Sequence, residues 1–239
     1  MHAGYPIGDA IGGLFGAVSV LAACWKRARD PAAPGEEIDL SLCEATLRIL
    51  DFLPIEYDQT GVVRGRSGNK NQYSAPSAVY RTRDDQWVTL SGSTNAMFAN
   101  NCRAIDRPEL TSDTRFRNNG SRCDHAAELN SIFSDWCERH DLTDVLEAFT
   151  REDGTLAPIN SIDQIFADPQ MIARDAITSV ADRDFGFVRM QNVVPRFAND
   201  PGFVKWTAGD IGQDNSCVLG DRLGLSSAEL EKLRQSGVI

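Results

Sequence analysis

The stretch that decides the fold is Gly8-Asp-Ala-Ile-Gly-Gly-Leu-Phe-Gly-Ala-Val-Ser-Val-Leu-Ala-Ala-Cys-Trp25. Its apolar side chains recur at steps of three and four residues, which predicts a continuous apolar stripe along an α-helix: Ile11, Leu14, Phe15, Val18, Leu21, Ala22 and Trp25. Gly8, Gly12 and Gly16 fall on another face. Because glycine costs a helix interior about 1 kcal/mol relative to alanine, these glycines indicate that another group approaches the backbone closely. We expect this helix to be buried on several sides and central to the fold.

A membrane-spanning segment and a secretory signal peptide are weaker interpretations of the same helix. A span needs about 18 or more apolar residues, whereas the uncharged run from Ala10 to Trp25 has 16 and is rich in glycine. A signal peptide needs a positively charged region before the apolar run, and only Asp9 stands there. Read by itself, the segment also leaves open a plain core helix, in which the glycines have no special function.

Composition excludes several classes of protein. The 239 residues suffice for one large domain or two small ones. A net charge of −10 and a pI near 4.8 argue against nucleic-acid binding. The six cysteines contain no C-x-x-C pair and indicate reduced core thiols of a cytoplasmic protein. The three histidines share no ligand spacing, so we expect no metal site.

Two regions after the first helix have readable periodicity. Ile38, Leu40 and Leu42 alternate with polar residues, which predicts a half-buried strand over residues 36–42. Helical spacing then resumes at Cys43, and we expect that helical pattern to run out at Pro54. Further on, β-branched and aromatic residues flank a pair of aspartates, which predicts an antiparallel hairpin over residues 78–90.

A polar, glycine-bearing and basic segment lies between these regions. Residues 64–72, here called the basic loop, are Arg64, Gly65, Arg66, Ser67, Gly68, Asn69, Lys70, Asn71 and Gln72. Glycines leave backbone N–H groups free to turn inward, and the local positive charge can attract an anion. The basic loop is therefore predicted to be a mobile lid that closes over an anionic ligand. A solvated linker between two domains is the open alternative.

Short segments along the chain resemble the class III CoA transferases, the CaiB/BaiF family that includes formyl-CoA transferase and α-methylacyl-CoA racemase. The resemblance begins with D-x-x-G-G at residues 9–13 and I-D-L-S-L at residues 38–42. It continues in order to the C-terminus through Gly68-Asn69, Ala75-Pro76, Pro108-Glu-Leu110, Ala157-Pro-Ile159, Asp168-Pro-Gln170 and Leu223-Gly-Leu-Ser226. No single segment is specific, but their order is.

The resemblance implies an α/β fold that corresponds to the C-terminal part of a family protein. Residues 1–75 are then a remnant of the large doubly wound domain, with a helix, a strand, a helix and the linker loop. Residues 76–177 form a discrete α+β small domain. Residues 178–239 form a returning linker and a C-terminal helix that packs on the large domain.

The resemblance also implies the chemistry. Family enzymes move CoA between an acyl-CoA thioester and a carboxylic acid through a covalent aspartyl intermediate. Coenzyme A is thus a substrate and no cofactor is bound tightly. Gly12 and Gly13 are expected to lie at the CoA site, and the basic loop to shelter the acyl group. The family's aspartate nucleophile precedes the D-x-x-G-G segment and has no counterpart here. We therefore expect no catalytic residue in this chain and no activity from it alone, with Asp9 serving as a helix cap.

Two further functions and the partners stay open at this point. The chain can be a non-catalytic interaction subunit of a hetero-oligomer, or part of an isomerase of the α-methylacyl-CoA racemase type. Expected partners are acyl-CoA, a carboxylic acid and either a second copy or a chain that carries the N-terminal half. Neither nucleic acid nor a membrane is expected. The sequence does not specify the acyl donor or the acceptor acid.

Overall fold

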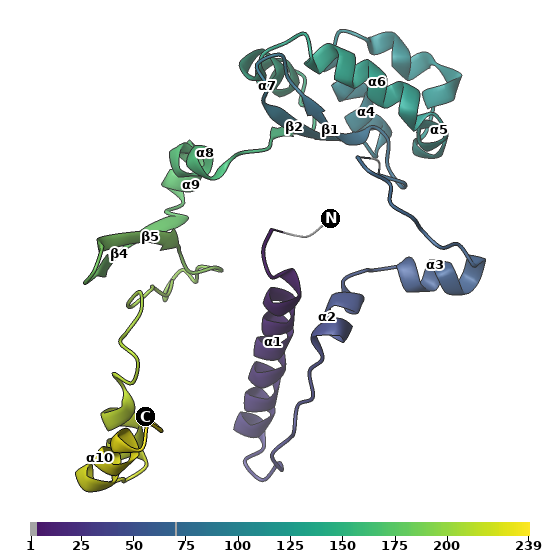
Figure 1. Ribbon diagram of the computed structural model, residues 1–239. Coiled ribbons are helices and arrows are strands. Elements are labelled where there is room, and N and C mark those ends of the chain that lie inside the picture. Colours follow the sequence, from purple (N-terminus) through teal and green to yellow (C-terminus); the bar gives the residue numbers. More distant parts are fainter. Residues whose placement is uncertain (1–3, 70) are drawn as a thin grey trace. The chain divides into compact units, whose positions relative to one another are not determined.

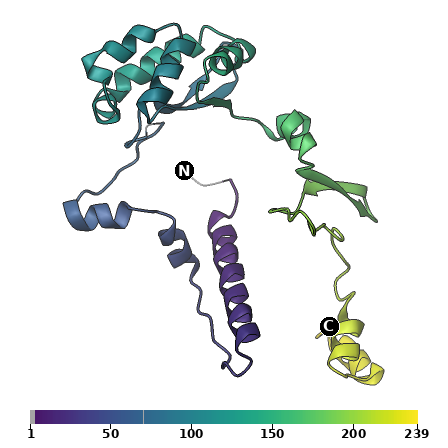
Figure 2. The ribbon, with the colours of Figure 1, turned by 180° about the vertical axis from the view of Figure 1, so that it is seen from behind.

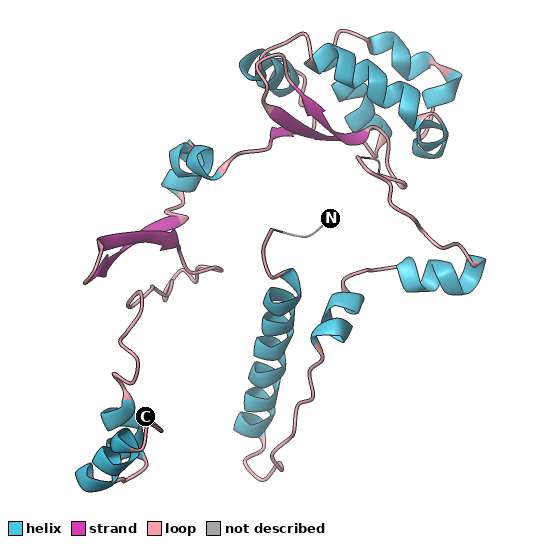
Figure 3. Cartoon of the chain, in the orientation of Figure 1, coloured by secondary structure: helices cyan, strands magenta, loops and turns pink. Residues whose placement is uncertain are grey.

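The computed structural model describes residues 4–69 and 71–239 (Figure 1). Contacts within the chain divide it into two compact units, Met1–Gly68 and Asn69–Ile239. Figure 3 shows helices in both units and strands in the second. The predicted α/β class is therefore confirmed, and each unit is described by itself below.

The first unit consists of α1 (Ile7–Arg29), α2 (Leu42–Arg48) and α3 (Leu53–Thr60). The predicted first helix is confirmed, with Asp9 in its first turn and basic residues in its last, where each sign of charge complements the helix dipole. Helix α2 lies beside α1 in the views of Figure 1 and Figure 2. The glycine face of α1 meets the segment that leads into α2: a Cβ at Gly12 would lie 2.3 Å from Cδ2 of Leu42.

The expected burial of α1 is not found within the described residues. Four side chains of its apolar stripe are between 65 and 69% exposed: Leu14, Val18, Leu21 and Trp25. The reason is that residues 40–46 pack on the glycine face, so these four side chains receive little cover from the described part of this unit. Helix α1 is also long and apolar enough to cross a membrane, but the core helix of a soluble protein can meet the same criterion of length and composition.

Two predictions for the first unit are wrong, namely the strand over residues 36–42 and the helix end at Pro54. Residues 36–41 form no strand, because no neighbouring backbone in the described chain supplies the ladder hydrogen bonds that a strand requires. Pro54 does not end a helix but stands in the first turn of α3, where its missing N–H has no intrahelical partner to lose. Helix α3 ends instead at Gly61, whose φ of +70° suits glycine.

The second unit begins with a three-stranded antiparallel sheet. Strands β1 (Ser77–Arg81) and β2 (Trp87–Ser91) form the predicted hairpin, and β3 (Leu156–Pro158) pairs with the other edge of β2. Asp85 in the turn has a φ of +64°, a conformation that aspartate tolerates better than most residues. Because β2 lies between β1 and β3, strand β1 is an edge strand of this sheet.

Helices and the sheet enclose the main core of the second unit. They are α4 (Asn95–Ala104), the 3-10 turns η1 (Pro108–Ser112) and η2 (Thr114–Phe116), α5 (Asn119–Asp124), α6 (Ala126–Cys137) and α7 (Leu142–Arg151). The largest buried apolar side chains include Phe98, Phe116, Phe133, Phe149, Leu90, Ile105 and Leu129. An aspartate ahead of an apolar stripe predicts a helix that starts at Asp124, but α6 starts two residues later, at Ala126, because Asp124 is still the last residue of α5.

The C-terminal part of the second unit carries local structure with strong sequence signals. It contains α8 (Ile162–Ala167), α9 (Pro169–Ala173), the hairpin of β4 (Ile177–Asp182) and β5 (Gly186–Gln191), the π-helical turn η3 (Ser216–Arg222) and α10 (Ser227–Gln235). Ser161 and Ser226 each stand three residues before a glutamine or a glutamate, a spacing that predicts a capping box, and both boxes are present. Asp168 directly precedes a proline, a pair that predicts a helix start, and it caps α9 by accepting the Met171 N–H.

Candidate functional site

The basic loop is held at its start by an ion pair. Arg64 donates from Nε and Nη2 to both carboxylate oxygens of Glu56 in α3. The hydrogen bond from Arg64 lowers the pKa of Glu56. Both side chains are only about one-fifth exposed, at 20% and 23%. The positive charge that the sequence places at Arg64 is therefore already neutralised within its own unit.

Asn69 holds the basic loop at a second point. Its Nδ2 donates to the Val79 carbonyl oxygen at 2.5 Å, and its Oδ1 accepts the Val79 N–H at 2.8 Å. The side-chain amide thus satisfies the outward-facing backbone groups of one residue on edge strand β1, as a neighbouring strand would. The sequence singled out Gly68-Asn69 without predicting this contact.

Arg122 fixes the chain that follows the basic loop. Its guanidinium is fully buried and donates to the Ala75 carbonyl at 2.7 Å, the Ser93 carbonyl at 2.8 Å and Asn95 Oδ1 at 2.8 Å, with longer bonds to Gly92 and Phe116. No carboxylate is among these partners, and burial lowers the pKa of the group. Sequence reasoning missed Arg122, whose only signal is a basic residue next to apolar core segments.

The remaining predicted residues of the basic loop differ in their contacts. Asn71 accepts the Tyr73 N–H at 2.9 Å, and Gln72 is exposed. Gly65 and Gly68 have open space where a Cβ would stand, and Gly68 has a φ of +62°. Arg66 is exposed, and no hydrogen bond or ion pair engages it within residues 4–69 and 71–239. Lys70 lies outside the described residues.

The two glycines predicted to lie at the CoA site have different surroundings. Gly12 is buried against Leu42, whereas a Cβ at Gly13 would meet no described atom within 4 Å apart from its chain neighbours and the nearby backbone of its own helix. The close approach that the glycines indicated is thus made by a side chain of this chain at Gly12. A contact of either glycine with CoA stays a prediction.

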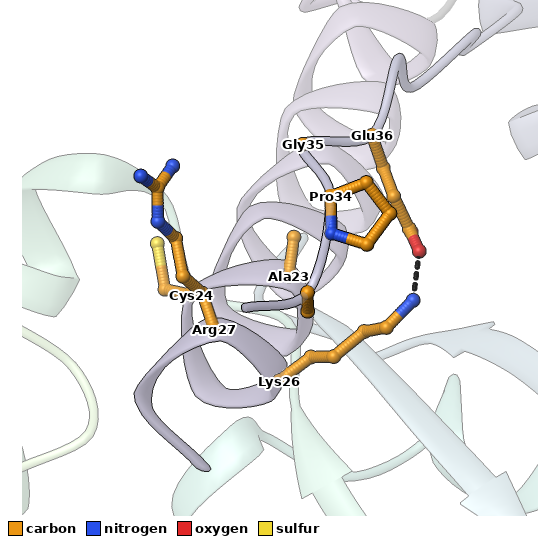
Figure 4. A pocket seen from close by; sticks show the side chains of 8 residues that line it. Ala23, Cys24, Lys26, Arg27, Pro34, Gly35 and Glu36 are labelled. Atoms are coloured by element: carbon orange, nitrogen blue, oxygen red, sulfur yellow. Dashed lines mark hydrogen bonds and ion pairs between the residues drawn. The ribbon is translucent and has the colours of Figure 1, made fainter. Parts of the chain in front are cut away.

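A pocket of about 220 Å³ lies at the C-terminal end of α1 (Figure 4). Lys26 and Glu36 form an ion pair across it, while Cys24 and Arg27 point to the other side of the helix end. The remaining lining residues are Ala23, Ala33, Pro34 and Gly35. Because Glu36 neutralises Lys26, the net charge of the lining is that of Arg27, and the lining offers no nucleophile–base pair.

Carboxylates of the described chain do not form a sheltered nucleophilic site. The buried polar side chains belong to Thr82, Asn101 and Arg122, so none of the described aspartates or glutamates is buried. Asp9 is exposed, and Pro6 stands at the N-cap of α1 without a side-chain cap bond, so the prediction that Asp9 caps the helix is wrong. Within residues 4–69 and 71–239 no group of histidine, cysteine and acidic side chains could hold a metal ion.

The cysteines are free thiols, but only some belong to the core. Cys102 and Cys137 are buried, and burial raises the pKa of each thiol to about 12. Exposed positions hold Cys24, Cys43 and Cys217, which corrects the prediction that the cysteines are core residues. Helix spacing alone could not show which apolar stripes are covered.

The fold is that of the CaiB/BaiF proteins. A CaiB/BaiF family protein from Brucella suis superimposes with a TM-score of 0.73 at 21% identity, over 92% of this chain and 56% of that one. The D175A mutant of Rv3272 from Mycobacterium tuberculosis superimposes with a TM-score of 0.74 at 18% identity, over 90% of this chain and 55% of that one. A family model described as CoA-transferase family III matches residues 1–215, and the chain belongs to that family.

Curated relatives resemble the chain along nearly its whole length. It is 35% identical over 99% of its residues to a succinyl-CoA–D-citramalate CoA-transferase of Chloroflexus aurantiacus. It is 32% identical over 98% of its residues to the beta subunit of a succinyl-CoA–L-malate CoA-transferase from the same organism. In both cases the chain spans 58% of the relative's length.

Proposed function

We propose that this chain is part of a CoA transferase that moves CoA from an acyl-CoA thioester to a carboxylic acid. The observation that carries the proposal is the 35% identity, over 99% of the chain, to an enzyme named for that reaction. The relatives' names pair succinyl-CoA with D-citramalate or L-malate. We therefore propose dicarboxylic acids as the substrate class, both as the donor acyl group and as the acceptor.

The proposed reaction proceeds by covalent catalysis on a carboxylate. The carboxylate attacks the thioester carbonyl and expels CoA thiolate, which leaves a mixed anhydride on the enzyme. The thiolate then attacks the enzyme's acyl carbon, so that the donor acid departs and an enzyme–CoA thioester forms. The acceptor carboxylate repeats these steps in reverse order and leaves as its CoA ester, which restores the free carboxylate.

We propose that the nucleophilic carboxylate lies outside residues 4–69 and 71–239. Support comes from the finding that none of the described carboxylates is buried, since an anhydride that water can reach would hydrolyse before transfer. The role left to this chain is to carry the basic loop beside the reacting acyl group. The division into segments 1–75, 76–177 and 178–239 and a cytoplasmic location belong to the same proposal.

The exposed stripe of α1 supports the proposal that further polypeptide completes the enzyme. Burial of a leucine or a similar side chain contributes roughly 1.5–3 kcal/mol. Four side chains of the stripe are about two-thirds exposed in the described chain, so covering them would provide a large share of the stability of a domain. A polypeptide that packs on this stripe, whether in the same chain or in a separate subunit, fits the expected hetero-oligomer or dimer.

A transfer assay tests the proposal. The chain carries an affinity tag, is isolated from the cells that produce it together with any polypeptide that stays bound, and is supplied with succinyl-CoA and D-citramalate or L-malate. We expect citramalyl-CoA or malyl-CoA to form in step with free succinate, and we expect the chain expressed alone to form neither. Epimerisation of 2-methylacyl-CoA without any transfer would instead identify the isomerase, and the absence of both reactions would leave an interaction subunit.

A further inference from the structure

Contacts of Arg64 and Asn69 anchor the basic loop at two points, and only a short link lies between them. Arg64 is fixed to Glu56 in the first unit, and Asn69 is fixed to Val79 in the second. Only residues 65–68 lie between these two anchors. Four residues span at most about 14 Å when fully extended, so the link can move its side chains only within a limited range of either anchor.

Arg66 is the one basic residue in this link. Glycine precedes it at position 65, and Gly68 follows with a left-handed φ of +62°. The structure gives it neither an ion pair nor a hydrogen bond among the described residues, in contrast to Arg64. In a chain of net charge −10, an exposed guanidinium that none of the acidic residues engages is available to an external anion.

We propose that Arg66 binds the non-reacting carboxylate of a dicarboxylic substrate, and that it thereby selects dicarboxylic over monocarboxylic acyl groups. This inference rests on the proposed function. A guanidinium pairs with a carboxylate through two parallel hydrogen bonds, a geometry that Lys does not reproduce. A dicarboxylic acyl group offers one such carboxylate in addition to the reacting carbonyl, whereas a monocarboxylic group offers none.

The phosphates of CoA are the other anions within the same chemistry. They are common to every acyl-CoA, so a contact with them cannot discriminate between acyl groups. A single guanidinium also balances the charge of one carboxylate, whereas CoA carries several negative charges. Comparison of two donors that differ only in the second carboxylate therefore separates the two sources of the anion.

The test compares succinyl-CoA with butyryl-CoA as donors for the enzyme isolated with its bound polypeptides. We expect Arg66→Gln to lower kcat/KM for succinyl-CoA about 10- to 100-fold, the loss of one charged hydrogen-bonded pair. The value for butyryl-CoA should stay within about twofold of the unsubstituted enzyme. Arg66→Lys should recover part of the loss. Arg117→Gln, at another exposed arginine, should change neither donor.

Each other outcome overturns the inference in a recognisable way. Equal losses for both donors would mean that Arg66 contacts the CoA phosphates, and no loss for either would mean that it contacts no anion. If butyryl-CoA reacts too slowly to measure, inhibition by free succinate must weaken in the Arg66→Gln variant while inhibition by butyrate does not. Failure of the unsubstituted enzyme to transfer CoA to any acid would refute the proposed function itself.

Discussion

Replacement of Arg122 by methionine should destabilise the second unit strongly. Methionine keeps most of the aliphatic length but removes every donor, so the carbonyls of Ala75 and Ser93 and Oδ1 of Asn95 lose their shortest hydrogen bonds, of 2.7, 2.8 and 2.8 Å. Each bond contributes a net amount of about 1–1.5 kcal/mol once the burial of the guanidinium is subtracted. The three bonds together give an expected loss of about 3–5 kcal/mol in the free energy of unfolding, near the upper end for single substitutions.

Urea denaturation followed by tryptophan fluorescence measures this loss. Arg103→Met is the matched control, because Arg103 pairs with Glu152 at the surface, where the two side chains are 47% and 27% exposed. Such a pair contributes about 0–1 kcal/mol. A cost below about 1 kcal/mol for Arg122→Met would contradict this role, since the buried guanidinium would then contribute no more than the exposed one.

Further predictions concern the glycine face, an acidic side chain and the thiols. Gly13→Ala should stabilise the chain against urea by about 0.5–1 kcal/mol, because open space receives the new methyl group, whereas Gly12→Ala should give no such gain because its Cβ would meet Leu42; equal gains at both positions would contradict the packing. The hydrogen bond from Arg115 lowers the pKa of Asp113 to about 2. The stability that Asp113 contributes relative to Asp113→Asn should therefore be complete above an unfolded pKa near 4, and should disappear as the pH falls through about 2. A difference between the two that stays constant down to pH 2.5 would exclude the shift. A chromogenic disulfide reagent should label the exposed cysteines of the native chain within minutes but reach Cys102 and Cys137 only on unfolding, and rapid labelling of either would show that the core is open.

Local signals predicted the local structure well. The capping boxes at Ser161 and Ser226 place a hydroxyl and a glutamine or glutamate three residues apart, and each decides a helix start through hydrogen bonds within one turn. The hairpin around Asp85 was predictable for the same reason, because its strands are consecutive and its turn residue tolerates a positive φ. Periodicity of apolar residues likewise predicted α1.

Features that depend on distant partners were not predictable from the sequence. The alternation of Ile38 and Leu40 indicated a strand, but a strand also needs a neighbouring backbone, and the pattern contains no information about one. Charge at Arg64 suggested an anion site, yet Glu56, eight residues earlier, engages it. The partners of Arg122 come from segments up to 47 residues away, and no spacing rule connects them.

The central claim is that the covalent chemistry occurs on a carboxylate outside the described residues of this chain. Incubation of the isolated enzyme with succinyl-CoA, rapid quenching and mass spectrometry of its peptides would locate the CoA thioester. We expect a CoA adduct on an aspartate in polypeptide that is not part of residues 4–239, and no adduct on any peptide of this range. A CoA thioester on a carboxylate within the range, such as Asp9, would contradict it.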